Sequence, residues 1–446
     1  MKPTLYIAGL SAIALASSAY ADVTVTFTGA TAFRAATLLS IKSRFSDSGQ
    51  PFKYAHDQVA GNLNAVAPNA TRAIFIGTFP GVTGVTTIKC CFTGSVEGIR
   101  AVTGAFDPLP PTYYPSSILD STTAVATTGG ELALNSSSAG SPVALGGPSD
   151  IAFSDVSKAI TPYASLPTLP ASAAAGVIVF TMLTNEGSAI TNVTSLQFRA
   201  LLTKGFQPLS LFTSNPADTT NVFATGRNDG SGTRSSYLSA VGFGVANAVK
   251  QYVTIASTST ALGTIQLVPA GGVNTLNGQA TTGQSASNAS TVWGQDIAGN
   301  GGYNSGSALR TDMSKTGLAV TVLDNEGLDS FGGPVRADLV TWLSVNDAAT
   351  ARASGAVFCA YNGYKLDEVA AAGSALGTND KKKVTEGQYT AWNYEQMYRR
   401  SIYTSGDVKT IYDGVKAEIP TNLAAAGIAI TDMHVGRPND GGVVAP

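Results

Sequence analysis

Gly226-Arg227-Asn228-Asp229-Gly230-Ser231-Gly232-Thr233 is the stretch that decides how this sequence is interpreted. It places an arginine, an acid and a Ser-Gly-Thr turn directly before a segment, 234–252, that we predict to be helical. These residues are of the kinds that bind an oxyanion. A planar guanidinium donates two parallel hydrogen bonds to it. The free N–H groups at a helix start point toward it, and small residues let the backbone come close to it. Because Gly, Ser and Thr are abundant throughout the chain, the stretch is informative only if partners occur elsewhere.

Three polar residues follow predicted strands in a similar way. Thr31, Ser95 and Asp155 come at or just after the ends of short strand-like runs, over 22–27, 85–92 and 149–155. The simplest interpretation of Thr31 is a helix N-cap, and that of Asp155 is a turn residue or N-cap. Ligands of α/β proteins, however, bind at the carboxyl ends of strands, close to helix starts. We therefore predict that these side chains meet the 226–233 turn.

Strand patterns alternate with helical ones along the chain, which favours α/β domains with largely parallel sheets. The apolar run Ala175–Met182 has the look of a strand buried on both faces in a parallel sheet. Lys381-Lys382-Lys383 is interpreted as part of a solvated loop. Further helices are predicted near 33–45, 96–102, 196–203, 305–313 and 408–419.

The composition favours a multidomain globular protein without a nucleic-acid partner. With 446 residues the chain is long enough for about two or three domains. Apolar residues make up 44%, an ordinary share, whereas charged residues make up only 13%, about half of what is typical. The net charge is −2 and no strongly basic face is evident, so the sequence offers no positively charged surface to a nucleic-acid partner.

The N-terminus is typical of a secretory signal peptide. Lys2 precedes an apolar run over 5–16, and Ala19-Tyr20-Ala21 forms an A-x-A site, so we expect cleavage after Ala21. The run is too short to span a bilayer, and no later stretch is long and apolar enough. We predict a periplasmic or extracellular protein without a membrane span.

The cysteines and histidines do not form a metal-binding pattern. Cys90 or Cys91 could pair with Cys359 in an oxidising compartment, and three unpaired thiols are the equally weighted alternative. The two histidines, His56 and His434, lack zinc-site spacing. No metal or cofactor is predicted.

Taken together, the motifs resemble those of the phosphate-binding proteins of bacterial phosphate ABC transporters, which have the type II periplasmic binding fold. Arg227–Thr233 is close to identical to that family's Arg-x-Asp-Gly-Ser-Gly-Thr. The family's Gly-Ala/Ser-Thr, Gly-Ser-Ser-Gly-Gly-Val and Asp-Ile/Phe-Gly-Ala-Ser-Asp stretches resemble residues 29–33, 94–99 and 150–155. The departures include Val96 in place of a serine, Glu97 beside it, and Thr390 in place of a proline.

The resemblance implies a phosphate site formed by Thr31, Ala32, Ser95, Asp155, Arg227, Ser231, Gly232 and Thr233. Hydroxyl and backbone N–H groups would donate, Arg227 would provide the charged fork, and Asp229 would orient Arg227. Asp155 would accept a hydrogen bond from a protonated ligand oxygen. A buried carboxylate beside an anion is costly without such a proton, which phosphate carries and sulfate lacks, so the site should reject sulfate. Glu97 is expected to face solvent in the first turn of a helix.

The same resemblance implies a two-domain α/β fold with the ligand in the interdomain cleft. Domain I would comprise 22–178 and 385–446, and domain II 179–384, closing like a hinge. The expected partners are inorganic phosphate and an ABC-transporter permease, and we expect a monomer that is not an enzyme.

Two alternatives stay open. One is a secreted or surface-associated protein that keeps the phosphate-binding fold for a role other than transport, since the segments 50–88 and 100–148 are long and no lipid anchor is evident. The other is a hydrolase of phosphate esters with Ser231 as nucleophile. It lacks the base that a nucleophile needs, because no histidine lies near any motif.

Overall fold

The structure is a computed structural model. It describes residues 22–58, 62–104, 110–120, 124–126, 131–134, 141–161, 163–166, 169, 173–268, 275–276, 279–280, 284–285, 301–368, 376–423 and 427–446. The predicted signal peptide lies outside these residues.

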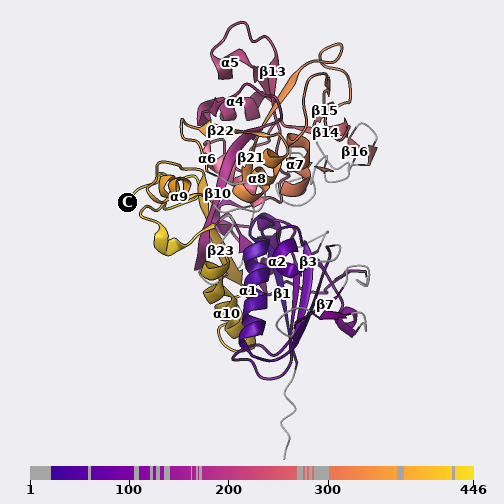
Figure 1. Cartoon of the computed structure of the whole chain (residues 1–446), viewed down its shortest axis with the longest axis vertical. Coiled ribbons are helices and arrows are strands. Elements are labelled where there is room, and N and C mark those ends of the chain that lie inside the picture. The colour runs from indigo at the N-terminus through magenta and orange to yellow at the C-terminus, as the bar shows by residue number, and fades with distance from the viewer. Residues whose placement is uncertain are drawn as a thin grey trace, which may run out of the picture.

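Two lobes lie one above the other, with β10 (Ala173–Thr184) running from one to the other (Figure 1). The lower or first lobe contains the early part of the chain and, in yellow, the helix α10 from near its end, which packs beside α1. Its elements are β1 (Val23–Gly29), α1 (Arg34–Asp47), β2 (Phe52–His56), α2 (Leu63–Val66), β3 (Arg72–Gly77), β4 (Thr86–Cys91), α3 (Ser95–Thr103), β5 (Thr112–Tyr113), η1 (Ser116–Asp120), β6 (Ala124–Ala126), β7 (Glu131–Leu134), β8 (Val143–Ala144), β9 (Ile151–Ser154), η3 (Lys158–Ile160), β23 (Trp392–Arg399), α10 (Asp407–Asn422), β24 (Gly427–Ile428) and η4 (Ile430–Asp432).

The upper or second lobe is built from the middle of the chain (Figure 1). Its elements are β11 (Asn192–Val193), α4 (Ser195–Lys204), β12 (Phe206–Pro208), α5 (Ser210–Thr213), β13 (Asn221–Ala224), α6 (Gly232–Ala240), β14 (Tyr252–Ser257), β15 (Leu262–Leu267), β16 (Thr275–Leu276), β17 (Gln279–Ala280), β18 (Gln284–Ser285), β19 (Gly302–Tyr303), α7 (Gly306–Met313), β20 (Thr321–Leu323), β21 (Ala337–Ser344), α8 (Val345–Ala353), β22 (Val357–Tyr361) and α9 (Thr378–Thr385).

One mixed sheet runs through both lobes, in the order β12-β13-β21-β10-β23-β9-β1-β4-β3-β2-β7-β6, with helices packed against it. The protein is therefore α/β. In the first lobe β1 is parallel to both β4 and β9, so the carboxyl ends of all three meet at one edge. In the second lobe β13 is parallel to β21. These edges are the ones that carry the candidate residues.

The core is divided between the lobes. One cluster of buried apolar side chains includes Phe27, Phe45 and Phe75 of the first lobe, and another includes Phe223 and Trp342 of the second. The two predicted domains, with boundaries at 178/179 and 384/385, stay a prediction.

Three local predictions are wrong. The strand predicted over Ala175–Met182 exists as β10, but it is antiparallel to β21, β22, β23 and β24, because an apolar run reports burial and not strand direction. The helix predicted over 234–252 ends at Ala240, where Gly242 and Gly244 adopt positive φ of 63° and 93°. The lysines at 381–383 lie in helix α9, where Lys383 pairs with Asp367 and Asp380.

The cysteines are present as thiols. Cys90, Cys91 and Cys359 are free and buried, so of the two alternatives left by the sequence the structure has the unpaired one. Burial raises the pKa of each thiol, which favours its neutral form. Within the described part of the chain, none of the helices combines the length and the apolar character needed to cross a bilayer.

Candidate anion-binding site

The 226–233 turn joins β13 to the start of α6 at the face where the two lobes meet. Ser231 is the N-cap residue of α6, and its backbone N–H donates to the carbonyl of Asn228 at 3.2 Å. The Ser231 hydroxyl makes no capping bond to its own helix. Gly232 and Thr233 follow as the first helical residues, and all three are buried. The helix start thus presents N–H and hydroxyl donors at the lobe boundary, as an anion requires.

Arg227 is held in place by backbone carbonyls from a distant segment. Its Nε donates to the Tyr303 carbonyl at 3.0 Å, and its Nη2 donates to the Asn304 carbonyl at 3.1 Å. The side chain is only 2% exposed. Burial lowers the pKa of Arg227 to about 10, an effect that the charges of Asp347 and Asp155 oppose, so the guanidinium stays charged at neutral pH.

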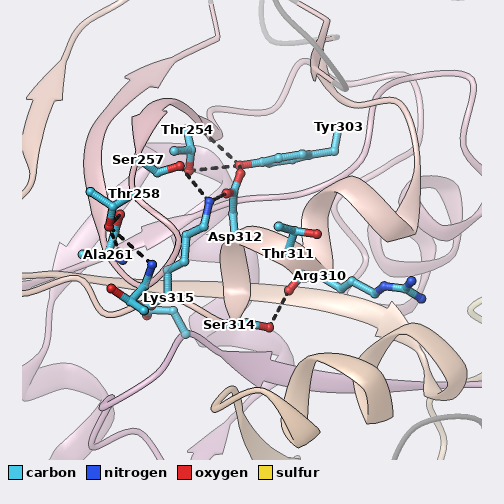
Figure 2. A network of polar contacts seen from close by, with 12 residues as sticks. Thr254, Ser257, Thr258, Ala261, Tyr303, Arg310, Thr311, Asp312, Ser314 and Lys315 are labelled. Atoms are coloured by element: carbon cyan, nitrogen blue, oxygen red, sulfur yellow. Dashed lines mark hydrogen bonds and ion pairs between the residues drawn. The ribbon is translucent and has the colours of Figure 1, made fainter.

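The segment that holds Arg227 is in turn fixed by a polar network inside the second lobe (Figure 2). The Tyr303 hydroxyl donates to Asp312 Oδ2 at 2.7 Å and lies 3.1 Å from the Thr254 hydroxyl. Lys315 Nζ contacts the other carboxylate oxygen, Oδ1 of Asp312, at 2.7 Å. A buried network with these bonds satisfied fixes one arrangement of its members. The position of the Arg227 fork therefore depends on residues far from it in sequence.

Asp155 faces the turn from the first lobe, at the end of β9. It is 2% exposed, and its Oδ1 is buried with no hydrogen-bond partner among the described residues. Its backbone N–H donates to Ser95 Oγ at 3.3 Å, which places Ser95 beside it. Burial raises the pKa of Asp155 to about 6, and the charge of Arg227 and a hydrogen bond with Thr233 act in the opposite direction.

Glycines allow the two lobes to touch here. A Cβ on Gly232 would lie 2.3 Å from Asp155 Oδ1 and 2.4 Å from Ser95 Oγ. A Cβ on Gly94, where φ is +137°, would lie 2.5 Å from the carbonyl oxygen of Gly230. No side chain fits at either position. Ser95, Asp155, Gly232 and Thr233 therefore form one cluster, and Arg227 is near enough to act on the charge of Asp155.

Asn393, on β23, connects the two halves of this cluster. Its Nδ2 donates to the Asp155 carbonyl at 3.1 Å and to the Ser236 hydroxyl of α6 at 2.7 Å. Sequence reasoning did not select it, nor the anchors Tyr303 and Asn304. An asparagine beside Trp392 carries no motif, and a carbonyl anchor can come from any residue type.

The other two predicted residues of the first lobe line cavities between the lobes. Thr31 and Ala32 line a cavity of about 30 Å³, together with Arg310 and Asp347 of the second lobe. Thr31 also lines a larger interlobe cavity of about 400 Å³. The N-cap interpretation of Thr31 is wrong, because Phe33 is the N-cap residue of α1.

Of two acidic residues near the turn, one differs from what was expected and the role of the other stays a prediction. Glu97 does not face solvent: it is 7% exposed, lines the larger cavity and forms an ion pair with Arg100. Helix α3 is buried along nearly its whole length, so its first turn has no solvent face. Asp229 is fully buried, and its charge acts on Arg234, whose pKa it raises against the effect of burial. That Asp229 orients Arg227 stays a prediction.

No group of three or more His, Cys, Asp or Glu within the described ranges could hold a metal ion. What these ranges bring together is an arginine, hydroxyls and helix N–H groups around one carboxyl. Such a set can donate hydrogen bonds to an oxyanion and accept one from it.

No family model matches the sequence, and no curated protein matches it. Among solved structures, an ABC-type phosphate transport receptor from Vibrio cholerae has a TM-score of 0.40 at 11% identity, over 90% of this chain and 99% of the other. PstS from Borrelia burgdorferi has a TM-score of 0.33 at 12% identity, over 91% and 99%. The phosphate binding protein from Stenotrophomonas maltophilia has 0.33 at 11%, over 90% and 84%. At these identities and TM-scores the three structures resemble this chain only distantly, and they do not show where a ligand binds.

Proposed function

We propose that this protein is a solute-binding protein that holds inorganic phosphate between its two lobes. The observation that carries the proposal is Asp155 Oδ1, a buried acceptor with no hydrogen-bond partner among the described residues, placed among the donors of a helix start and near Arg227. Leaving such an acceptor unpaired costs roughly 1–3 kcal/mol or more. A ligand that brings both a negative charge and a proton removes this cost.

Phosphate has these two properties at neutral pH, and sulfate has only the first. One phosphate oxygen would donate its proton to Asp155, while the others accept from Arg227, the α6 N–H groups and the hydroxyls of Ser95, Ser231 and Thr233. Thr31 and Ala32 would close the cage from the first lobe. Sulfate would face the Asp155 carboxylate with no proton between them, which costs several kcal/mol in a closed site.

The test is isothermal titration calorimetry of residues 22–446 with phosphate and with sulfate at pH 7.5. We expect phosphate to bind at least roughly a thousandfold more tightly, which corresponds to about 4 kcal/mol. Equal affinities would contradict the role of Asp155. Absence of phosphate binding would contradict the proposal as a whole.

We further propose that the protein is exported and delivers phosphate to a membrane permease as a monomer. The supporting features are the signal-like N-terminus and the two-lobed form. Co-purification of a permease with the tagged protein from its native host, and loss of phosphate uptake on deletion, would support this role. Unchanged uptake on deletion would favour the surface-associated alternative.

A further inference from the structure

A second interlobe cavity lies beside the proposed phosphate cage, and a phosphate ion alone would leave it unused. Its volume is about 400 Å³, within the range of pockets that hold small organic ligands. It shares Thr31 with the cage. Its wall also includes Asn304, whose carbonyl accepts from Arg227. The cavity and the fork of Arg227 are therefore neighbours.

The wall of this cavity is charged and buried. Arg34, Arg100 and Glu97 line it and are 5%, 3% and 7% exposed. Arg34 donates through Nε and Nη2 to the Pro68 carbonyl, the former at 2.6 Å, and Arg100 pairs with Glu97. Two arginines against one carboxylate leave the wall net positive. A ligand group that is itself cationic would be disfavoured there.

Two oxygen atoms in this wall have no hydrogen-bond partner among the described residues. They are Glu97 Oε1 and Thr93 Oγ1, and both are buried. A carboxylate oxygen accepts hydrogen bonds only, so Glu97 Oε1 needs a donor. Asn228 and Asn304 add carboxamide groups, and Phe92 is the aromatic member of the lining. Walls of this kind suit several hydroxyl groups better than a flat aromatic base.

We propose that the site takes the phosphate monoester of a small polyol, with the phosphate in the cage and the hydroxylated part in the cavity lined by Arg34, Thr93, Glu97, Arg100, Asn228 and Asn304. This inference rests on the proposed phosphate site and names its substrate class. A ligand hydroxyl donates to Glu97 Oε1, and the ester oxygen points past Thr31. The second pKa of an ester phosphate is near 6, so the ester would bind in its singly protonated form, a minor fraction at pH 7.5, and donate that proton to Asp155.

The experiment compares inorganic phosphate with glycerol 3-phosphate by calorimetry at pH 7.5, on residues 22–446 and on two variants. For the unchanged chain we expect both to bind. In Glu97→Gln the dissociation constant of the ester should rise by about tenfold relative to that of phosphate, because the acceptor loses its charge. Thr93→Leu fills the cavity and should weaken the ester by at least tenfold relative to phosphate, which keeps the test valid if Glu97→Gln does not fold. Glu326→Gln, an exposed carboxylate of the second lobe, is the matched control and should change neither affinity.

The outcomes separate the two proposals. Phosphate binding without ester binding overturns the polyol inference and leaves the phosphate site intact. Binding of neither overturns the phosphate site, and with it this inference. An ester affinity that does not change relative to phosphate in the folded variants overturns the assignment to this cavity.

Discussion

Arg227 and Asp155 each follow a strand on opposite lobes, yet only Asp155 keeps a buried polar atom without a hydrogen-bond partner in the described part of the chain. Each follows a strand, and each is 2% exposed. Arg227 already donates to two carbonyls, whereas Asp155 Oδ1 has no partner in the described part of the chain. Burial shifts both pKa values toward the neutral forms, to about 10 and about 6. Only the second value comes close to physiological pH.

The difference assigns different tasks to the two residues. A guanidinium fixed before the ligand arrives loses little freedom on binding, so Arg227 supplies attraction to any tetrahedral anion. A carboxylate oxygen that lacks a partner, as Asp155 Oδ1 does among the described residues, is satisfied only by a ligand with a proton to donate, so Asp155 selects among those anions. Substitution of Arg227 should therefore remove the attraction of anions, and substitution of Asp155 the selection among them.

The largest expected effect is the loss of the attraction that Arg227 exerts on the anion. Arg227→Ala should weaken phosphate binding by more than roughly a thousandfold, since removing one member of a buried charge contact costs 2–5 kcal/mol or more. Arg227→Lys should recover part of this loss, because it keeps the charge but not the fork. Calorimetry measures both variants.

Arg199→Ala, an exposed arginine on α4, is the control and should bind phosphate normally. If Arg227→Ala retained affinity within tenfold of the unchanged chain, Arg227 would not be the attracting group.

The next effect is the loss of selection. Asp155→Asn can both donate and accept, so sulfate should gain affinity while phosphate loses some. We expect the ratio of the two dissociation constants to fall by at least roughly a hundredfold, about 3 kcal/mol. Competition between the two anions in one titration measures this ratio directly. A ratio that stayed above a thousandfold would assign the discrimination to another group.

The candidate residues were predictable from the sequence to a larger degree than the contacts that hold them in place. Asp155, Ser95 and Thr31 could be placed because parallel strands bring their carboxyl ends to one edge, and strand ends can be located from apolar patterns. Residues 226–233 were predicted as a turn before a helix, and they do lead into the start of α6. For these residues a local pattern and a general rule of sheet topology were enough.

What holds these residues was not predictable, because it comes from distant segments. Tyr303 and Asn304 approach Arg227 across a glycine-rich stretch with no periodic pattern. Glu97 was misplaced since a helical position alone does not reveal whether that side packs against another lobe. The direction of β10 is likewise set by its partners rather than by its own residues.

The smallest effect concerns the stability of the ligand-free protein. Burial raises the pKa of Asp155 from 3.8 to about 6, so the folded state binds more protons than the unfolded state between these pH values. The free energy of unfolding should therefore fall as the pH rises from about 4 to about 6, by at most about 3 kcal/mol from this group. Asp155→Asn removes this penalty but buries an amide that needs partners, so we expect it to stabilise the free protein at pH 7.5 by about 1–2 kcal/mol. At pH 4 the gain should vanish.

Urea unfolding at the two pH values, without phosphate, measures this difference. Asp120→Asn, at an exposed position at the end of η1, is the control and should show no pH-dependent gain. Adding phosphate should reverse the order at pH 7.5, because only the unchanged chain can use its carboxylate to hold the protonated ligand. If Asp155→Asn were less stable at pH 7.5 than the unchanged chain, Asp155 Oδ1 would already have a partner in the free protein. Selection would then have to arise elsewhere in the cleft.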